Sequence, residues 1–160
     1  MEIDKPALIG SLIVCLEGKL ESLTRAYESA HKGSIEAPGR NQSRYDSSKE
    51  ELGVIADGLN KKKFELEVAL KSLAVQKLEA NSSVQIGSFV ELRDEETGNK
   101  GSYFVMPSGG GVILQMGNLE VTVITPVAPL FKSIVTRRED DLVYFKFNGF
   151  EKVYKVMVVR

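Results

Sequence analysis

Apolar residues in the first half of the chain recur at alternating steps of four and three, the spacing of one helix face. The first row is Ile9, Ile13, Leu16, Leu20, Leu23, Tyr27 and Ala30, and a weaker row is Leu52, Ile55, Leu59, Leu66, Ala69 and Leu73. Each row predicts an amphipathic helix whose apolar stripe must be covered. The pattern therefore predicts an antiparallel helical hairpin, a short coiled coil, over residues 1–80.

The first helix is expected to begin after Asp4, an acidic cap that precedes Pro6, and to run to about His31. A polar segment that contains glycine and proline follows it. These residue types favour turns and do not continue a helix cheaply. Residues 32–44 are therefore expected to form the tip loop of the hairpin.

The second helix is expected to begin with a cap among residues 46–48 and to end near Ala80. Its apolar row is imperfect because Lys62 falls where an apolar side chain is expected. Gly53 and Gly58 each weaken the helix by about 1 kcal/mol relative to alanine. A kink or a contact with a partner is expected in this region.

From residue 84 onward the pattern changes from helical to alternating, which is typical of strands. The expected strands are 88–93, 102–106, 111–116, 119–124, 142–147 and 151–159, with a short helix at 130–134. Hairpins with one short helix indicate a small antiparallel β domain. The chain is thus predicted to be α+β, with residues 1–80 in the hairpin and residues 84–160 in the β domain.

Three consecutive glycines, Gly109, Gly110 and Gly111, raise the question of a phosphate-binding loop. Such a loop needs a following helix whose N-terminus faces the anion. The residues that follow, 112–114, are Val-Ile-Leu and predict a strand. We therefore expect these glycines to form a hairpin loop.

Composition limits the chemistry. A net charge of −1 argues against a protein held on nucleic acid by charge alone. Because Cys15 and His31 are the only residues of their kinds, an internal disulfide, a Cys-cluster metal site and a His-based metal site are all excluded. Residues 7–16 are apolar, but Val14 before Cys15 does not fit a cleaved lipoprotein signal. A cytoplasmic protein with no membrane partner is expected.

Several short motifs, taken in order, point to a known family. They are residues 45–51, 84–90, 94–98, 125–134, 141–143, 148–149 and 154–156. Over nearly the whole chain they resemble the Gre family of bacterial transcription elongation factors. The resemblance implies an FKBP-like C-terminal domain that binds RNA polymerase at the rim of its secondary channel. It also implies a coiled coil that enters the channel toward the active centre.

In that family two acids at the coiled-coil tip, in a Gly-Asp-x-x-Glu-Asn pattern before a tyrosine, help to hold a Mg²⁺ ion of the polymerase. Aligned on Tyr45, these acids correspond to Pro38 and Asn41, so both charges are absent. The resemblance therefore implies a divergent member, not itself an enzyme, that occupies the channel without efficient transcript cleavage. It needs no cofactor beyond the polymerase's Mg²⁺. The tip candidates are Glu36, Arg40, Asn41, Arg44 and Asp46.

The segment expected to bind the polymerase is a proline-containing loop and the short helix after it. Its candidate residues are Thr125, Pro126, Pro129, Leu130, Phe131 and Lys132. Whether Phe131 is an exposed anchor or a core residue stays open. The expected form is a monomer with, at most, indirect contact with nascent RNA. Two alternatives are an FKBP-type prolyl isomerase or chaperone, sensitive to changes near Phe104 or Tyr144, and a coiled-coil adaptor, suggested by Lys62.

Overall fold

The computed structural model describes residues 3–37, 47–79 and 81–160. The chain forms two compact units. We call Val14–Lys71 the helical hairpin, and Met1–Ile13 together with Ser72–Arg160 the β domain. The sequence had placed all residues up to 80 with the helices. The β domain includes the two helix ends because they carry Leu8, Leu12 and Leu73, which are almost completely buried.

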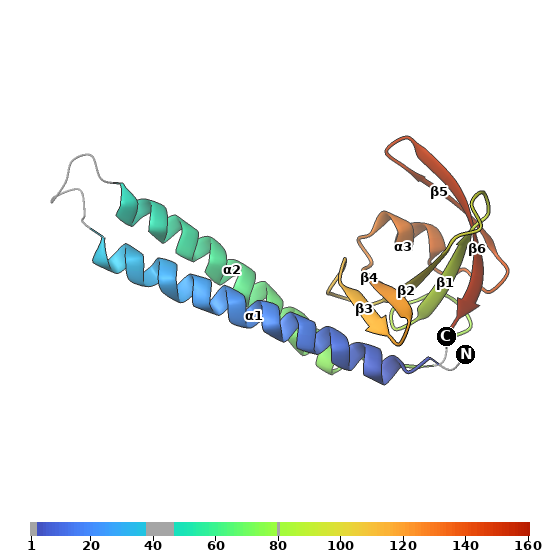
Figure 1. Cartoon of the computed structure of the whole chain (residues 1–160), viewed down its shortest axis with the longest axis horizontal. Coiled ribbons are helices and arrows are strands. Elements are labelled where there is room, and N and C mark those ends of the chain that lie inside the picture. The colour runs from blue at the N-terminus through green and yellow to red at the C-terminus, as the bar shows by residue number, and fades with distance from the viewer. Residues whose placement is uncertain (1–2, 38–46, 80) are drawn as a thin grey trace. The chain divides into compact units, whose positions relative to one another are not determined.

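The two long helices, α1 (Lys5–Glu36) and α2 (Ser48–Ala74), run antiparallel (Figure 1). α1 continues past His31, so the predicted end of this helix is wrong. The reason is visible at Gly33, where an added Cβ would lie 3.1 Å from Cδ1 of Leu52. The glycine does not end the helix but lets α2 approach closely. α2 ends at Ala74, earlier than the predicted Ala80.

Burial along the helices confirms the first apolar row, because all its members are buried or half-buried. The second row needs correction. Ile55 is 52% exposed, whereas its neighbour Ala56 is 3% exposed. The row that stays out of solvent is Leu52, Ala56, Leu59, Lys63, Leu66, Leu70 and Leu73. It keeps the four-three spacing without a break and places Lys63, not Lys62, in the contact face.

The β domain is built on a six-stranded sheet of order β3-β4-β2-β1-β6-β5. Its strands are β1 (Phe89–Asp94), β2 (Lys100–Val105), β3 (Ile113–Met116), β4 (Leu119–Ile124), β5 (Leu142–Phe147) and β6 (Phe150–Val159). Neighbours are antiparallel except β2 and β4, which pair in parallel. The short helix α3 (Pro129–Ile134) lies beside the sheet (Figure 1). The predicted α+β fold class is confirmed.

The glycine segment 109–111 does not form the predicted hairpin loop, because β2 and β3 are not paired with each other. Gly109 has a φ of 83°, and a Cβ added to it would lie 2.8 Å from Cδ1 of Leu12. A side chain is therefore excluded by both backbone conformation and space. The segment provides a surface on which the first turns of α1 pack.

Around the central strands β1, β2 and β4, both faces of the sheet are buried. One face contributes Val90, Leu92 and Val105 to a core cluster that also contains Phe131 and Ile134 of α3. Strand alternation points another set of side chains to the opposite face. This set, Phe89, Phe104, Val121 and Val123, is at most 1% exposed. A sheet buried on both sides holds its loops in fixed positions.

Candidate functional site

Residues 125–132, the segment expected to bind a partner, form a turn that leads directly into α3. The backbone N–H of Ala128 donates to the carbonyl of Thr125 at 2.9 Å, and that of Lys132 donates to the carbonyl of Ala128 at 3.2 Å. Pro129 occupies the first turn of the helix, where its fixed φ costs nothing. The entry to α3 is therefore a rigid, defined surface feature.

The side chains of this segment divide between core and surface. Phe131 is 9% exposed and belongs to the core cluster, so the core alternative holds for it. Leu130 is half-buried against the same cluster. Thr125 and Pro126 are also half-buried, and the exposed candidates are Pro129 and Lys132. The buried side chain of Phe131 thus holds α3 on the core, and the exposed residues of the segment face solvent.

Sequence reasoning missed Val127, which is 79% exposed in this segment. It is an apolar side chain between two prolines, in a stretch with no helical or alternating period. That context is itself the indication of exposure, because a residue outside any periodic row has no predicted core face. Val127 therefore provides the exposed apolar side chain that Phe131, being buried, does not provide.

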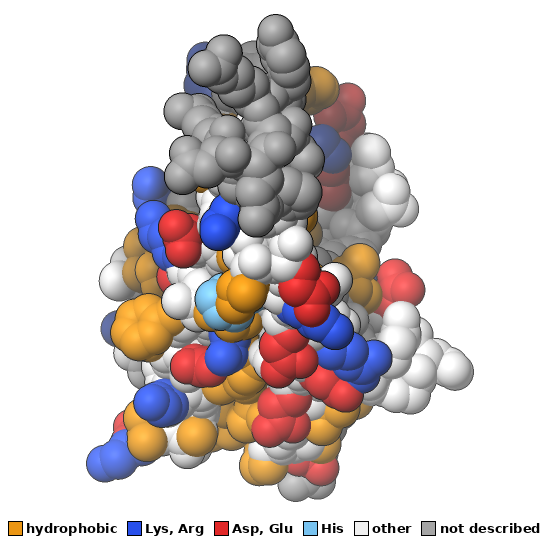
Figure 2. Space-filling model, turned by 90° about the vertical axis from the view of Figure 1, so that its left-hand side faces the viewer, with side chains coloured by type: hydrophobic (Ala, Val, Ile, Leu, Met, Phe, Trp, Pro, Cys, Tyr) orange, Lys and Arg blue, Asp and Glu red, His pale blue; other side chains and the backbone are white. Residues whose placement is uncertain are grey.

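At the far end of α1, Glu36 is the last helical residue. Its carboxylate lies 3.8 Å from Nζ of Lys32, and both side chains are largely exposed. The other tip candidates are Arg40, Asn41, Arg44 and Asp46, which lie outside the described residues. Acidic and basic side chains are interspersed on the face of the molecule shown in Figure 2. Glu36 is thus a carboxylate with a basic neighbour one turn away.

Lys63 is the polar member of the helix contact face. Its Nζ lies 5.9 Å from the centre of the Tyr27 ring and 3.9 Å from Oε1 of Glu67. The lysine stem is largely covered, while the ammonium group reaches an aromatic face and a carboxylate. Tyr27 also stacks on His31, with 5.5 Å between the ring centres. Of these contacts, the one between Lys63 and the Tyr27 ring joins α1 to α2, whereas the other two lie within one helix each.

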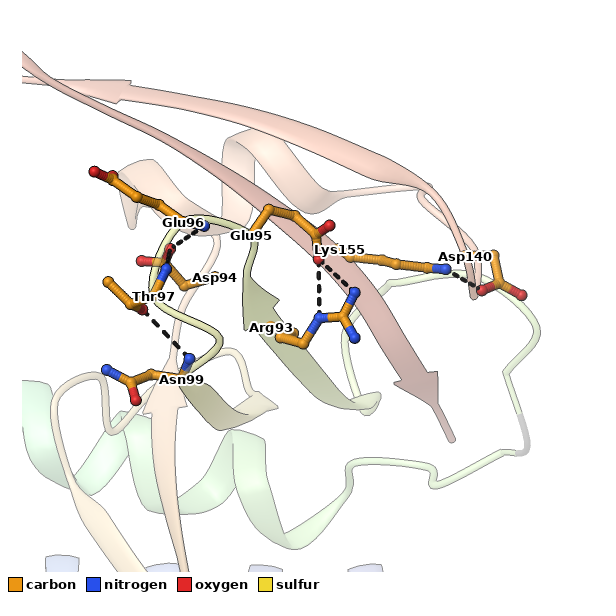
Figure 3. Close-up of polar contacts among 8 residues, drawn as sticks. All are labelled: Arg93, Asp94, Glu95, Glu96, Thr97, Asn99, Asp140 and Lys155. Atoms are coloured by element: carbon orange, nitrogen blue, oxygen red, sulfur yellow. Dashed lines mark hydrogen bonds and ion pairs between the residues drawn. The ribbon is translucent and has the colours of Figure 1, made fainter.

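The turn between β1 and β2 is organised by Asp94 (Figure 3). Its carboxylate accepts the backbone N–H groups of Glu96 and Thr97, each at 3.0 Å, and pairs with Lys152 at 2.5 Å. The ammonium group of Lys152 and these N–H groups lower the pKa of Asp94 to about 2. Asp94 therefore stays ionised and ties the turn to β6.

Beside this turn, the β5–β6 hairpin carries a group of aromatic residues, of which the sequence analysis named only Tyr144, for the prolyl isomerase alternative. Tyr144 is 76% exposed and Phe150 is 71% exposed. The Phe145 ring lies 6.4 Å from that of Phe147 and 6.2 Å from that of Tyr154. The indication in the sequence was the number of aromatic residues on both sides of the Asn-Gly turn at 148–149.

Of the two residues named for the prolyl isomerase alternative, Phe104 is completely buried, whereas Tyr144 is 76% exposed and lines a hollow. The coiled-coil adaptor was suggested by Lys62, which interrupts the apolar row predicted for the second helix. Lys62 is exposed, and the observed contact row passes through Lys63 without interruption. Within the described residues, no group of three His, Cys, Asp or Glu side chains is placed to hold a metal ion. No helix formed by these residues is long and apolar enough to cross a membrane.

The chain matches no family model. It is 26% identical over 121 residues to a transcription elongation factor GreA of Thioalkalivibrio sulfidiphilus, which covers 76% of this chain and 72% of that protein. Among solved structures, the transcription factor Gfh1 has 19% identity, 94% coverage of both chains and a TM-score of 0.41. GreA factor homolog 1 of Thermus thermophilus has 21% identity, 92% and 94% coverage and a TM-score of 0.38. Because these TM-scores are low, the similarity to the Gre factors rests on the sequence match.

Proposed function

We propose that this chain, which resembles the Gre transcription elongation factors, binds RNA polymerase at its secondary channel and regulates elongation or initiation without efficient transcript cleavage. The observation that carries the proposal is the similarity to GreA, because it extends over 121 residues and therefore over both compact units. The helical hairpin is the part that would reach toward the active centre. The β domain is the part that would hold the polymerase.

The surface of residues 125–132 suits a docking role. Pro126 and Pro129 restrict the backbone before binding, which lowers the entropy lost on association. Val127 offers an exposed apolar contact, and Lys132 offers a charge beside it. Phe131 keeps this surface attached to the core.

Cleavage of backtracked RNA depends on carboxylates that position a Mg²⁺ ion and its water. Pro38 and Asn41 stand at the two positions where the family carries these acids. Glu36 is a single carboxylate and has Lys32 beside it. The chain is therefore proposed to act as an accessory factor that occupies the channel, with no cofactor of its own.

Binding is tested by titrating core RNA polymerase with the full chain and with the variant Val127→Ala. We expect Val127→Ala to weaken binding about tenfold, the size of effect typical of a central apolar contact. The control is Ile113→Ala, because Ile113 is also exposed, at 60%, but lies on the edge strand β3. Failure of the unaltered chain to bind polymerase contradicts the proposal.

Cleavage is tested by adding the chain to stalled, backtracked transcription complexes. The unaltered chain is expected to leave the RNA length unchanged. The double variant Pro38→Asp, Asn41→Glu is expected to shorten the RNA at least about tenfold faster, because it restores two anionic ligands. Rapid shortening by the unaltered chain that is lost in Glu36→Gln contradicts the cleavage part of the proposal alone.

A further inference from the structure

The β5–β6 hairpin and the β1–β2 turn enclose a hollow of about 380 Å³, which no part of the proposed function uses. Its walls are Tyr144, Phe145 and Val153, and its rim carries Glu95, Glu96, Lys146, Glu151 and Lys152. The volume is at the low end of the range of about 300–1,000 Å³ found for ligand pockets. The hollow therefore has room for one long side chain and its neighbours.

The backbone holds the two sides of this hollow together. The N–H of Glu95 donates to the carbonyl of Val153 at 2.9 Å, and Asp94 pairs with Lys152. Within the β5–β6 hairpin, Tyr144 is paired in register with Val153. The aromatic wall and the acidic turn thus keep a fixed separation.

The charges around the hollow do not cancel. Lys146 pairs with Glu151, Lys152 pairs with Asp94, and Arg93 pairs with Glu95 at 2.7 Å. Glu96 is exposed and takes part in none of the ion pairs formed by the described residues of this region. The rim carries three glutamates and two lysines, so the hollow lined by Tyr144, which is 76% exposed, has an excess of negative charge to which Glu96 contributes.

The exposed Tyr144 ring and the Glu96 carboxylate line the same hollow, and a ring face together with a carboxylate is a combination that recognises a cation. The ring face attracts an ammonium or guanidinium group, and its body covers the apolar stem of the same side chain. The carboxylate supplies the complementary charge. A neutral apolar ligand would not use the excess negative charge of the rim, and an anion would be repelled by it.

We propose that this hollow binds a lysine or arginine side chain of RNA polymerase, as a second contact separate from the surface of residues 125–132. The inference rests on the proposed function, because that function supplies the partner. Tyr144 provides the ring for the cation, and Glu96 provides its counter-charge. The contact adds affinity through charge and aromatic packing, whereas the 125–132 surface adds it through a rigid apolar loop.

The test is the dissociation constant of the full chain for core RNA polymerase. Tyr144→Ala and Glu96→Lys are each expected to weaken binding about tenfold, and Glu96→Gln less than Glu96→Lys. Matched controls are Ile113→Ala and Glu120→Lys, which alter exposed apolar and acidic residues of β3 and β4 and are expected to change the constant less than about twofold. Hydrogen exchange of each variant checks that its β domain is folded.

The outcomes separate the two proposals. If the unaltered chain binds and both Tyr144→Ala and Glu96→Lys bind equally well, the second contact is overturned while the proposed function stands. If Tyr144→Ala weakens binding but Glu96→Lys does not, the contact is not with a cation and the inference fails in that form. If the unaltered chain does not bind polymerase, the proposed function fails, and the inference fails with it.

Discussion

The two units of this chain bury their apolar residues in different ways. The β domain has a sheet whose central strands are covered on both faces, and many of its core side chains are completely inaccessible. In the helical hairpin, the buried hydrophobic residues among those described are Leu16, Ala30 and Ala56, two of which are alanines. A pair of helices has one contact face, so most of each helix remains in solvent. The β domain is therefore expected to carry the larger share of the folding free energy.

The two units also differ in how they accommodate a polar side chain. In the β domain, Asp94 is 4% exposed and receives hydrogen bonds from both backbone and Lys152. In the helical hairpin, the side chain of Lys63 is 29% exposed and contacts only a ring face and one carboxylate. The β domain surrounds its polar group, whereas the hairpin lets its polar group reach the surface. Substitutions should consequently cost more in the first unit than in the second.

The largest effect is expected for Ile134→Ala in α3. Ile134 is completely buried, and such truncations cost about 3 kcal/mol of unfolding free energy. Urea unfolding followed by hydrogen exchange, segment by segment, should show the loss in the β domain. The control is Lys132→Ala on the exposed side of the same helix, which should change the stability by less than about 0.5 kcal/mol. Equal stability of the two variants would contradict the assignment of α3 to the core.

A smaller effect, dependent on pH, is expected from Asp94. Its pKa is lowered from 3.8 to about 2 by Lys152 and by the N–H groups of Thr97 and Glu96. Because the folded pKa lies below the unfolded one, the stabilisation is complete above about pH 4 and is lost as the pH falls toward 2. Asp94→Asn should remove this part of the pH dependence, measured by urea unfolding at a series of pH values. An unchanged pH profile in the variant would show that Asp94 does not anchor the turn.

In the helical hairpin, Gly58→Ala should stabilise the protein by about 1 kcal/mol. An added Cβ at Gly58 meets no atom within 4 Å, so only the gain in helix propensity remains. Gly33→Ala is the matched comparison, because its Cβ would lie 3.1 Å from Leu52 and the same gain is opposed by crowding. Helix unfolding by circular dichroism should separate the two variants. A larger gain for Gly33→Ala would contradict the close approach of the helices there.

The smallest change in stability is expected for Lys63→Met. The gain from an apolar side chain in the contact face is offset by the loss of the Tyr27 and Glu67 contacts, leaving a net stabilisation of about 0.5 kcal/mol or less. A polar residue in such a face also selects one pairing over others. Light scattering should therefore show more self-association for Lys63→Met than for Lys62→Met, since Lys62 is exposed. Equal self-association of the two variants would contradict a role of Lys63 in selecting the helix pairing.

Much of the fold was predictable because the hydrophobic period is a local property. The four-three row in the first helix and the alternation after residue 84 predicted the strands and the short helix close to their observed bounds, but not the C-terminal ends of the two long helices. The second helical row was assigned through Ile55 and Lys62, whereas the residues in the contact face are Ala56 and Lys63. A long, flexible stem that lets the charge reach the surface makes Lys63 acceptable there.

The parts that sequence reasoning did not find depend on contacts between distant residues. Gly109 is required because Leu12, far away in the chain, packs against it. Phe131 is a core residue because α3 turns this side chain toward the sheet, whereas Val127, in the turn before α3, is exposed. The grouping of Glu96 with Tyr144 needs β1 and β5 to be joined through β6. None of these follows from a local period.

The sequence by itself determined that this chain has two helices with one apolar face each and a small β domain, because spacing and turn residues act within a few positions. Only the tertiary structure decided which side chains are accessible for docking and which hold the core. Burial is a property of the assembled sheet and helices, and it is the sum of contacts that no single stretch of the chain contains.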